Sequence, residues 1–144
     1  MRGILTEDRR LNAVELCGRL QGMCLVVLAT VTADGRPLGG PVDSYFLHGS
    51  FYFSSARSSV RMRHLVARPA VSATYLPGED LSVTVHGSAE LFDVADPHHG
   101  ELREAMLEHY LPLQGPEFEL WLNDANPIGA RISADKLFTL AITR

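Results

Sequence analysis

The chain has 144 residues, of which 46% are hydrophobic and 21% are charged, and it carries a net charge of −4 with a pI near 5.8. This length and balance predict a single globular domain over residues 1–144, and the net acidity argues against a dedicated nucleic-acid-binding protein. No apolar run approaches the ~18–20 residues that span a bilayer, and the N-terminus lacks the apolar segment of a signal peptide. We therefore expect no membrane association and a cytoplasmic location.

Residues 9–20 repeat apolar side chains at a spacing that predicts a short amphipathic helix. Its apolar face consists of Leu11, Val14, Cys17 and Leu20. We interpret Cys17 as a small core residue and Cys24 as the start of an apolar strand. Neither cysteine belongs to a CxxC pair, so neither a structural zinc site nor a disulfide framework is expected.

The next segments predict a β-meander. Residues 25–32 are rich in β-branched side chains and almost wholly apolar, which is typical of a strand buried on both faces. An Asp-Gly turn signal within residues 33–37 predicts a hairpin. A return strand over residues 40–47 and a third strand over residues 50–55 follow, with a turn at residues 48–50.

Residues 54–69 form the one strongly basic segment of this acidic chain. Ser58 and Ser59 lie where a helix would begin, and the free N–H groups and positive dipole end of a helix N-terminus attract anions. The segment contains four arginines and no acidic residue; the arginines are Arg57, Arg61, Arg63 and Arg68. We interpret it as a phosphate-binding helix start, with a solvated basic helix face as the alternative.

A helical wheel separates the basic side chains of this segment from its apolar ones. The basic group spans about 60° and consists of Arg57, Arg61, His64 and Arg68. The apolar group, which we expect to dock on the core, consists of Met62, Leu65 and Val66.

The second half of the chain continues with strands. Residues 70–76 and 81–92 alternate apolar and polar side chains and predict two half-buried strands. Gly87 interrupts the second of them, which indicates a bulge or a close backbone approach.

A second helical region begins near Asp96, and residues 112–127 around Trp121 are rich in proline and predicted to be irregular. The last segments, residues 128–133 and 137–143, predict one bent strand or two short ones. About six to seven strands with a few flanking helices predict a mainly β fold, an antiparallel β-barrel, with a sandwich as the competing architecture.

Few residues outside the basic segment point to chemistry. His98 and His99 are adjacent and have no other ligand at useful spacing, so we expect no metal site. His86 projects from the polar face of its strand, as a proton donor to a ligand or as an ordinary surface histidine. Trp121 is interpreted as a core or interface residue, with ligand contact as the alternative. No nucleophile motif or P-loop occurs, so no catalytic residue is assigned, and the pattern is typical of proteins whose cofactor carries the chemistry.

Four stretches stand in a fairly specific order and spacing: residues 28–37 (LATVTADGRP), 49–55 (GSFYFSS), 59–71 and 85–90 (VHGSAE). Together they resemble the pyridoxamine 5'-phosphate oxidase-like superfamily, whose members are split β-barrels that bind flavins or deazaflavins. The resemblance runs from about residue 24 to residue 92, and more weakly to the end of the chain.

The resemblance implies roles for individual residues. Ser59 and Arg61 match the turn that holds the cofactor phosphate in this family, with Arg57 and Arg63 in support. The backbone of the second strand, around Val42 and Ser44, is implied to lie beside the isoalloxazine ring. Ser55 matches a position that borders the ring and the ribityl chain, and Ser82 matches a residue that approaches the cofactor from the other subunit. The residues that the resemblance implies at the cofactor are therefore Val42, Ser44, Ser55, Arg57, Ser59, Arg61, Arg63 and Ser82.

True pyridoxamine phosphate oxidases end in a segment with Trp and Arg that grips the substrate, whereas this chain ends Ala-Ile-Thr-Arg, so vitamin B6 oxidation is not expected. We expect a homodimer with two FMN sites at its interface that transfers hydride to an unidentified small organic substrate. The alternatives are a reductase that uses the deazaflavin F420, and a non-catalytic flavin- or haem-binding protein. A single-stranded nucleic-acid module that stacks bases on Tyr45, Phe46 and Tyr52 is the rival from another class, disfavoured by the net acidity.

Overall fold

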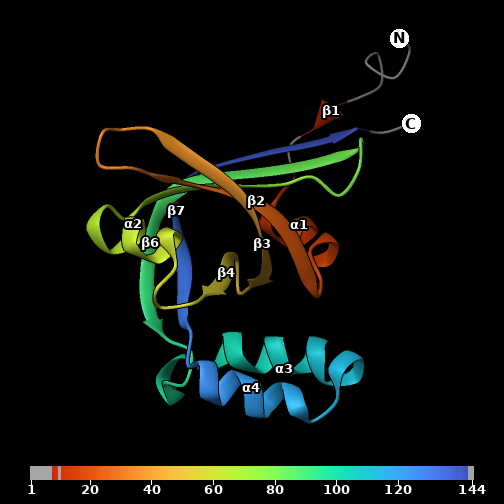
Figure 1. The fold of residues 1–144 in the computed structure, drawn as a ribbon. Coiled ribbons are helices and arrows are strands. Elements are labelled where there is room, and N and C mark those ends of the chain that lie inside the picture. The colour runs from red at the N-terminus through yellow and green to blue at the C-terminus, as the bar shows by residue number, and fades with distance from the viewer. Residues whose placement is uncertain (1–7, 10, 143–144) are drawn as a thin grey trace.

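The computed structural model describes residues 8, 9 and 11–142, and in it six antiparallel strands close into a barrel (Figure 1). The sheet order is β1-β7-β4-β3-β2-β5-β6, and a further pairing of β6 with β7 closes the barrel. The strands are β1 (Asp8–Arg9), β2 (Met23–Val31), β3 (Pro37–Leu47), β4 (Ser50–Ser55), β5 (Ala70–Tyr75), β6 (Leu81–Asp93) and β7 (Ile128–Ile142). The predicted antiparallel barrel is confirmed, because a sandwich would leave β6 and β7 in separate sheets.

Four α-helices flank the barrel in the described residues, and a single 3₁₀ turn, Pro97–His99, leads into the third. The helices are α1 (Ala13–Arg19), α2 (Val60–Ala67), α3 (Gly100–Gln114) and α4 (Glu117–Ala125). Figure 1 shows α3 and α4 side by side as a layer at one end of the barrel, while α2 lies beside it. None of these helices is both long and apolar enough to cross a membrane.

Two clusters of buried side chains hold these layers together. The main core fills the barrel, where Val26, Phe53 and Val83 have no exposed surface. A second core lies between the barrel and the α3–α4 hairpin and includes Tyr45 and Leu102. Side chains alternate across a strand, so β3 serves both cores: Ser44 faces the barrel interior while Tyr45 faces the helices.

The long pairing of β6 with β7 contains a bulge at Gly87, as the sequence predicted. The register shifts between His86 and Gly87, so that His86 pairs with Lys136 and Gly87 with Ala134. A Cβ atom on Gly87 would lie 2.0 Å from the carbonyl oxygen of Ser133. The backbones therefore approach so closely that only glycine fits, and the two C-terminal segments form one bent strand.

The first helix is shorter than predicted and is rotated. Asn12 caps it, accepting a hydrogen bond from the Glu15 N–H at 2.9 Å, so the helix begins at Ala13. Leu16 and Leu20 face the core, whereas Val14 is 81% exposed and Cys17 is exposed. The interpretation of Cys17 as a core residue is therefore wrong. The helix begins at Ala13, and the face that packs on the core carries Leu16 and Leu20 instead.

Two further expectations are corrected. Strand β2 is buried on one face only, since Leu25 and Val27 are more than half exposed in this chain. Residues 112–127 are mostly helical rather than irregular. The prolines do not prevent this, because Pro112 lies in the last turn of α3 and Pro116 immediately precedes α4. A proline before a helix costs no intrahelical hydrogen bond, so Pro116 starts α4 rather than preventing it.

The bulge generates a prediction for stability. Gly87→Ala should lower the free energy of unfolding by about 1–3 kcal/mol, because the new methyl group must push apart two paired backbones. Urea denaturation followed by circular dichroism measures the change. Gly39→Ala is the matched control, since its Cβ would meet the Val27 side chain at an ordinary 3.9 Å within another strand. Equal stabilities of the two variants would contradict the close approach.

Candidate functional site

The helix start predicted from the sequence is present at α2. Ser59 is its N-cap, and the Ser59 Oγ accepts a hydrogen bond from the Met62 N–H at 3.1 Å. The Ser55 hydroxyl, at the end of β4, donates to the same oxygen at 3.0 Å. Because both bonds use lone pairs of the Ser59 oxygen, its own hydroxyl proton is left to donate to a ligand. The basic segment thus begins in a helix N-terminus that Ser55 holds in place.

Arg61 brings a cation from the first turn of α2 to the edge of β3. Its Nη2 donates to the carbonyl oxygen of Pro41 at 3.3 Å. A Cβ on Gly40 would lie only 3.3 Å from the same nitrogen, so glycine makes room for the guanidinium group. Burial lowers the pKa of Arg61, which shows that its charge is partly desolvated. None of the ion pairs among the described residues involves Arg61, and a partly buried cation of this kind attracts an anion.

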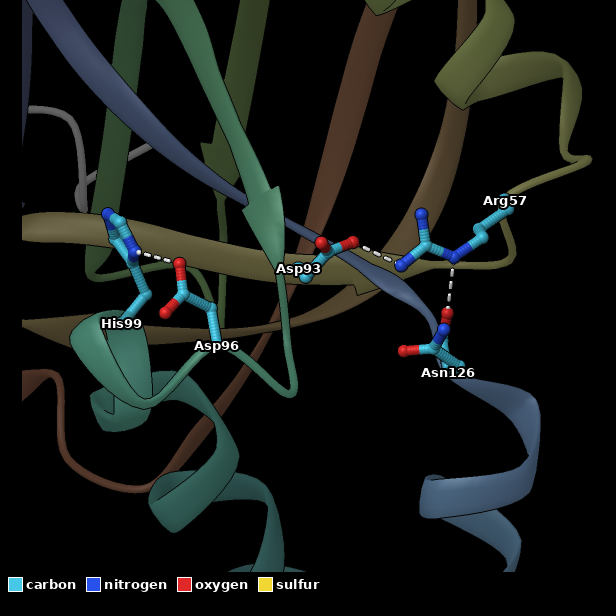
Figure 2. A network of polar contacts seen from close by, with 5 residues as sticks. All are labelled: Arg57, Asp93, Asp96, His99 and Asn126. Atoms are coloured by element: carbon cyan, nitrogen blue, oxygen red, sulfur yellow. Dashed lines mark hydrogen bonds and ion pairs between the residues drawn. The ribbon is translucent and has the colours of Figure 1, made fainter.

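Arg57 lies outside the helix and makes strong contacts of its own. Figure 2 shows its guanidinium group paired with Asp93 and donating to the backbone oxygen of Asn126, the latter at 2.8 Å. These contacts tie the turn before α2 to the end of β6 and to the end of α4. The same view shows Asp96 paired with His99 at the start of the helical layer. The helical wheel predicted that Arg57 and Arg61 share one face of the helix. This prediction is wrong, because α2 begins at Val60 and Arg57 lies before it.

The other basic residues of the segment have separate positions. His64 Nδ1 lies 2.9 Å from Thr30 Oγ1, and Arg68 Nε donates to the Val31 carbonyl at 2.9 Å, so both fasten α2 to β2. The Arg63 side chain is exposed. On the apolar side, Met62 and Leu65 are buried as expected, but Val66 is 70% exposed because the helix docks through a narrower face.

The remaining predicted residues lie on three strands. Val42 and Ser44 are both buried on β3, and the Ser44 hydroxyl donates to the Cys24 carbonyl at 2.7 Å. Both residues pair with β2, and Ser44 pairs with Phe53 of β4 as well, so the open part of the strand ends at Asp43. Ser82 is half-buried on the outer face of β6, opposite Leu140 of β7. The structure therefore gathers Val42, Ser55, Ser59 and Arg61 around one end of β3 and leaves Ser82 outside this group.

The β3 strand has an open edge beside α2. On one side β2 pairs with it from Pro37 to Tyr45, but on the other side β4 pairs only from Ser44 to Leu47. In the described ranges, residues 37–43 thus have no strand partner on the β4 side. Pro41 is tolerated there because its missing N–H costs no ladder bond. An open edge supplies backbone donors and acceptors next to the anion-binding helix start.

A cavity of about 420 Å³ adjoins this edge, between the barrel and the α3–α4 hairpin. From the strands it is lined by Val42, Asp43, Tyr45 and Ser54. From the helices it is lined by Met106, Tyr110, Gln114, Phe118 and Trp121. Sequence reasoning did not find this cavity, because α4 was not expected. The signal that could have found it is the helical spacing of Phe118 and Leu122, which both turn out to be buried.

Two tyrosines and an aspartate form the polar part of the cavity. The Tyr110 hydroxyl donates to Asp43 in a short hydrogen bond. The Tyr45 hydroxyl is buried near the Tyr110 hydroxyl, but no described residue meets it at the distance and angle of a hydrogen bond. Burial, with the nearby Asp43, raises the pKa of Tyr110 to about 12. Burial, followed by the proximity of Tyr110 and Asp43, also raises the pKa of Tyr45, so both phenols are neutral donors at physiological pH.

Metal ligation has no visible basis in this part of the molecule. Among residues 8, 9 and 11–142, no group of three or more His, Cys, Asp or Glu side chains is arranged to hold a metal ion. The described histidines have other neighbours: His86 lies 2.6 Å from the Ser72 hydroxyl, and His99 stacks on Phe92.

Comparisons with known proteins identify relatives of the whole barrel. A family model described as pyridoxamine 5'-phosphate oxidase matches residues 18–141. No curated protein matches the sequence. Solved structures with the same fold include a haem storage protein from Vibrio cholerae, with 17% identity and a TM-score of 0.68, covering 82% of this chain and 87% of that chain.

Two other solved structures cover nearly the whole molecule. An F420 reductase has 20% identity and a TM-score of 0.65, covering 90% of this chain and 98% of that one. An FAD-binding protein from Mesorhizobium loti has 21% identity and a TM-score of 0.65, covering 96% of this chain and 99% of that one. At such identities the likeness establishes the barrel fold alone.

The raised pKa values predict how stability depends on alkaline pH. Unfolded tyrosines ionise near pH 10, whereas Tyr110 keeps its proton in the folded state to about pH 12. Its contribution is therefore complete below pH 10 and is lost as the pH rises towards 12. Tyr110→Phe should show a shallower fall in the free energy of unfolding over this interval, measured by urea denaturation at each pH. An unchanged slope, or a Tyr110 that ionises near pH 10 by absorbance at 295 nm, would contradict the burial argument.

Proposed function

The chain belongs to the pyridoxamine 5'-phosphate oxidase family, and from this premise we propose that it is a flavin-dependent oxidoreductase that binds FMN and transfers hydride to a small organic acceptor. The observation that carries the proposal is the Ser59–Arg61 pair at the start of α2, beside the open edge of β3. This arrangement combines an anion-binding helix N-terminus, a partly buried guanidinium group and free backbone groups, which suit a phosphate joined to a polar planar ring.

Each group has a distinct part in holding the cofactor. Ser59 donates its hydroxyl proton to the phosphate, and Arg61 offers a planar fork of N–H donors. The exposed Arg63 adds positive charge on the same helix turn. Arg57 supports the phosphate site indirectly, because its bonds to Asp93 and Asn126 hold the turn that precedes the helix. In this way the protein orients the phosphate with little movement of its own backbone.

The β3 edge and the Ser55 side chain would border the ring. Backbone groups near Val42 and Ser44 are anchored by pairing with β2, and the Ser44 side chain is locked into the barrel. Backbone dipoles that are held in place in this way can stabilise charge on a bound ring without having to reorient. The hydride chemistry itself is supplied by the isoalloxazine when it is bound.

The deazaflavin F420 is the second candidate cofactor, because one solved structure of this fold is an F420 reductase and the exposed Arg63 could meet a longer anionic tail. Haem is a third ligand to test, given the haem storage protein of the same fold. A cytoplasmic location also stays a prediction.

We further propose a homodimer formed through the outer face of β2, β5 and β6. Leu25 and Val27 of β2 are 55% and 57% exposed, and Leu76 after β5 is 64% exposed. These side chains line an apolar hollow together with Thr84 and His86 of β6. Single exposed leucines are ordinary, but a contiguous apolar face on a sheet favours a partner. Ser82 lies on this same face of β6, consistent with a role at the cofactor of the other subunit.

The phosphate grip predicts the effect of one substitution on cofactor affinity. Arg61→Ala should weaken FMN binding by about 1.5–3 kcal/mol, the usual contribution of a hydrogen bond to a charged group. Titration of FMN fluorescence against purified protein measures the dissociation constant. Arg36→Ala removes the same charge from an exposed turn paired with Asp34, and should leave affinity unchanged.

The same titration with F420, and a search for a Soret band after haem addition, decide between the candidate cofactors. Tight binding of F420 but not FMN would transfer the proposal to a deazaflavin reductase. Binding of FMN with equal affinity in wild type and Arg61→Ala would refute the assignment of the grip.

The dimer proposal predicts a change of mass in solution. Val27→Glu should convert the dimer to monomer, because a charge on the apolar face must lose its water when the subunits meet. Sedimentation velocity measures the molecular mass. Leu113→Glu places the same charge on a 70% exposed leucine of α3 and should remain dimeric. A monomeric wild type, or a dimer that persists in Val27→Glu, would contradict the proposed interface.

A further inference from the structure

We propose that the cavity between β3 and the α3–α4 hairpin binds an aromatic compound that bears a carbonyl group and no negative charge, and that its carbonyl oxygen accepts a hydrogen bond from Tyr45. The inference rests on the proposed function only in that this compound is taken to be the acceptor of the hydride. The binding itself depends on side chains of the cavity and can be measured without any cofactor.

The size and walls of the cavity favour a small planar molecule. Its volume of about 420 Å³ lies at the lower end of the range of small-molecule sites. Phe118 and Trp121 of α4 lie with their ring centroids 5.6 Å apart and form one aromatic wall. The Met106 side chain from α3 adds a polarisable surface that adapts to aromatic rings. Trp121 is 57% exposed, so this wall also reaches the solvent, as an entrance requires.

The Tyr45 hydroxyl specifies a hydrogen-bond acceptor. The residue is only 3% exposed, and its hydroxyl, although near that of Tyr110, meets no described residue at hydrogen-bond geometry. A buried polar group without a hydrogen bond is costly, so it is rarely kept without a reason. Since the phenol is neutral, it can donate its proton. A carbonyl oxygen of a ligand would satisfy this donor and be fixed by it.

Asp43 argues against an anionic ligand. Its carboxylate lines the same cavity, and the hydrogen bond that it receives there comes from an uncharged group, the Tyr110 hydroxyl. No ion pair links Asp43 to a described Lys or Arg side chain. An anionic ligand would therefore meet an uncompensated negative charge at short range. The cavity thus differs from the arginine-lined phosphate grip, although the two share the β3 segment around Val42.

The experiment uses the cofactor-free protein and the single tryptophan of the chain as the reporter. The probe is 2-acetylnaphthalene, and its isostere 2-isopropenylnaphthalene replaces the carbonyl by a carbon–carbon double bond. Titration of the one indole N–H signal in the ¹⁵N NMR spectrum gives each dissociation constant and locates the ligand at Trp121. In the wild type the ketone should bind about tenfold more tightly than the isostere, the ratio expected for one hydrogen bond.

Tyr45→Phe should abolish this preference, bringing the two constants within about twofold of each other, while it keeps the fold because no hydrogen bond is lost. Tyr75→Phe, on β5 outside the cavity, is the control and should retain the preference. A further probe tests charge: 2-naphthoate should bind more weakly than the ketone.

Three results would overturn the inference: no saturable shift of the Trp121 signal, a preference for the ketone that survives in Tyr45→Phe, or tighter binding of 2-naphthoate than of the ketone. The proposed cofactor is judged separately by the FMN titration of Arg61→Ala. Ketone binding that depends on Tyr45 in a protein that binds no flavin would therefore uphold the cavity and overturn the redox assignment. FMN binding without ketone binding would uphold the cofactor assignment and overturn the inference about the cavity.

Discussion

The closure of the barrel by β7 is the constraint on which the rest of the structure depends. This strand pairs with β4 over its first four residues and with β6 along nearly its whole length. To do both it must bend, and the bend is made at the bulge opposite Gly87, where the Ser133 carbonyl passes too close for any side chain. Because β4 leaves the sheet after Ser55, closure at one end of the barrel is obtained without closure along the whole of β3.

The open part of β3 is a direct consequence, and it explains why the candidate site lies where it does. The chain that leaves β4 turns into α2, so the helix N-terminus comes next to strand residues that lack a partner. Arg61 satisfies one of these groups, the Pro41 carbonyl, and leaves others to a ligand. Arg57 then locks the turn to two distant elements (Figure 2). The proposed phosphate grip and the open edge thus arise from the same chain path.

The sequence was informative wherever a local signal decided the outcome. The Asp-Gly turn, the strict alternation in residues 81–92 and the serine start of α2 all gave correct elements, since each depends on neighbours in the chain. The helical face of residues 9–20 was misjudged because the Asn12 cap, not the hydrophobic spacing, fixes where the helix begins. The pairing of Arg57 with Asp93, and the meeting of Tyr45 with Tyr110, join residues 36 and more positions apart, and no local pattern encodes such contacts.

The architecture separates the two parts of the candidate site. The grip at α2 belongs to the barrel, whose chain path is set by strand pairing, whereas the cavity depends on a helical hairpin packed against one end. Substitutions on α3 and α4 can therefore reshape the cavity while the barrel keeps its pairing. Solved structures of the same fold are described as an F420 reductase, an FAD-binding protein and a haem storage protein, so the fold alone does not fix the ligand. In this chain the hairpin brings Tyr110, Phe118 and Trp121 to face Tyr45, so the cavity combines polar side chains held by strand pairing with an aromatic wall that strand pairing does not constrain.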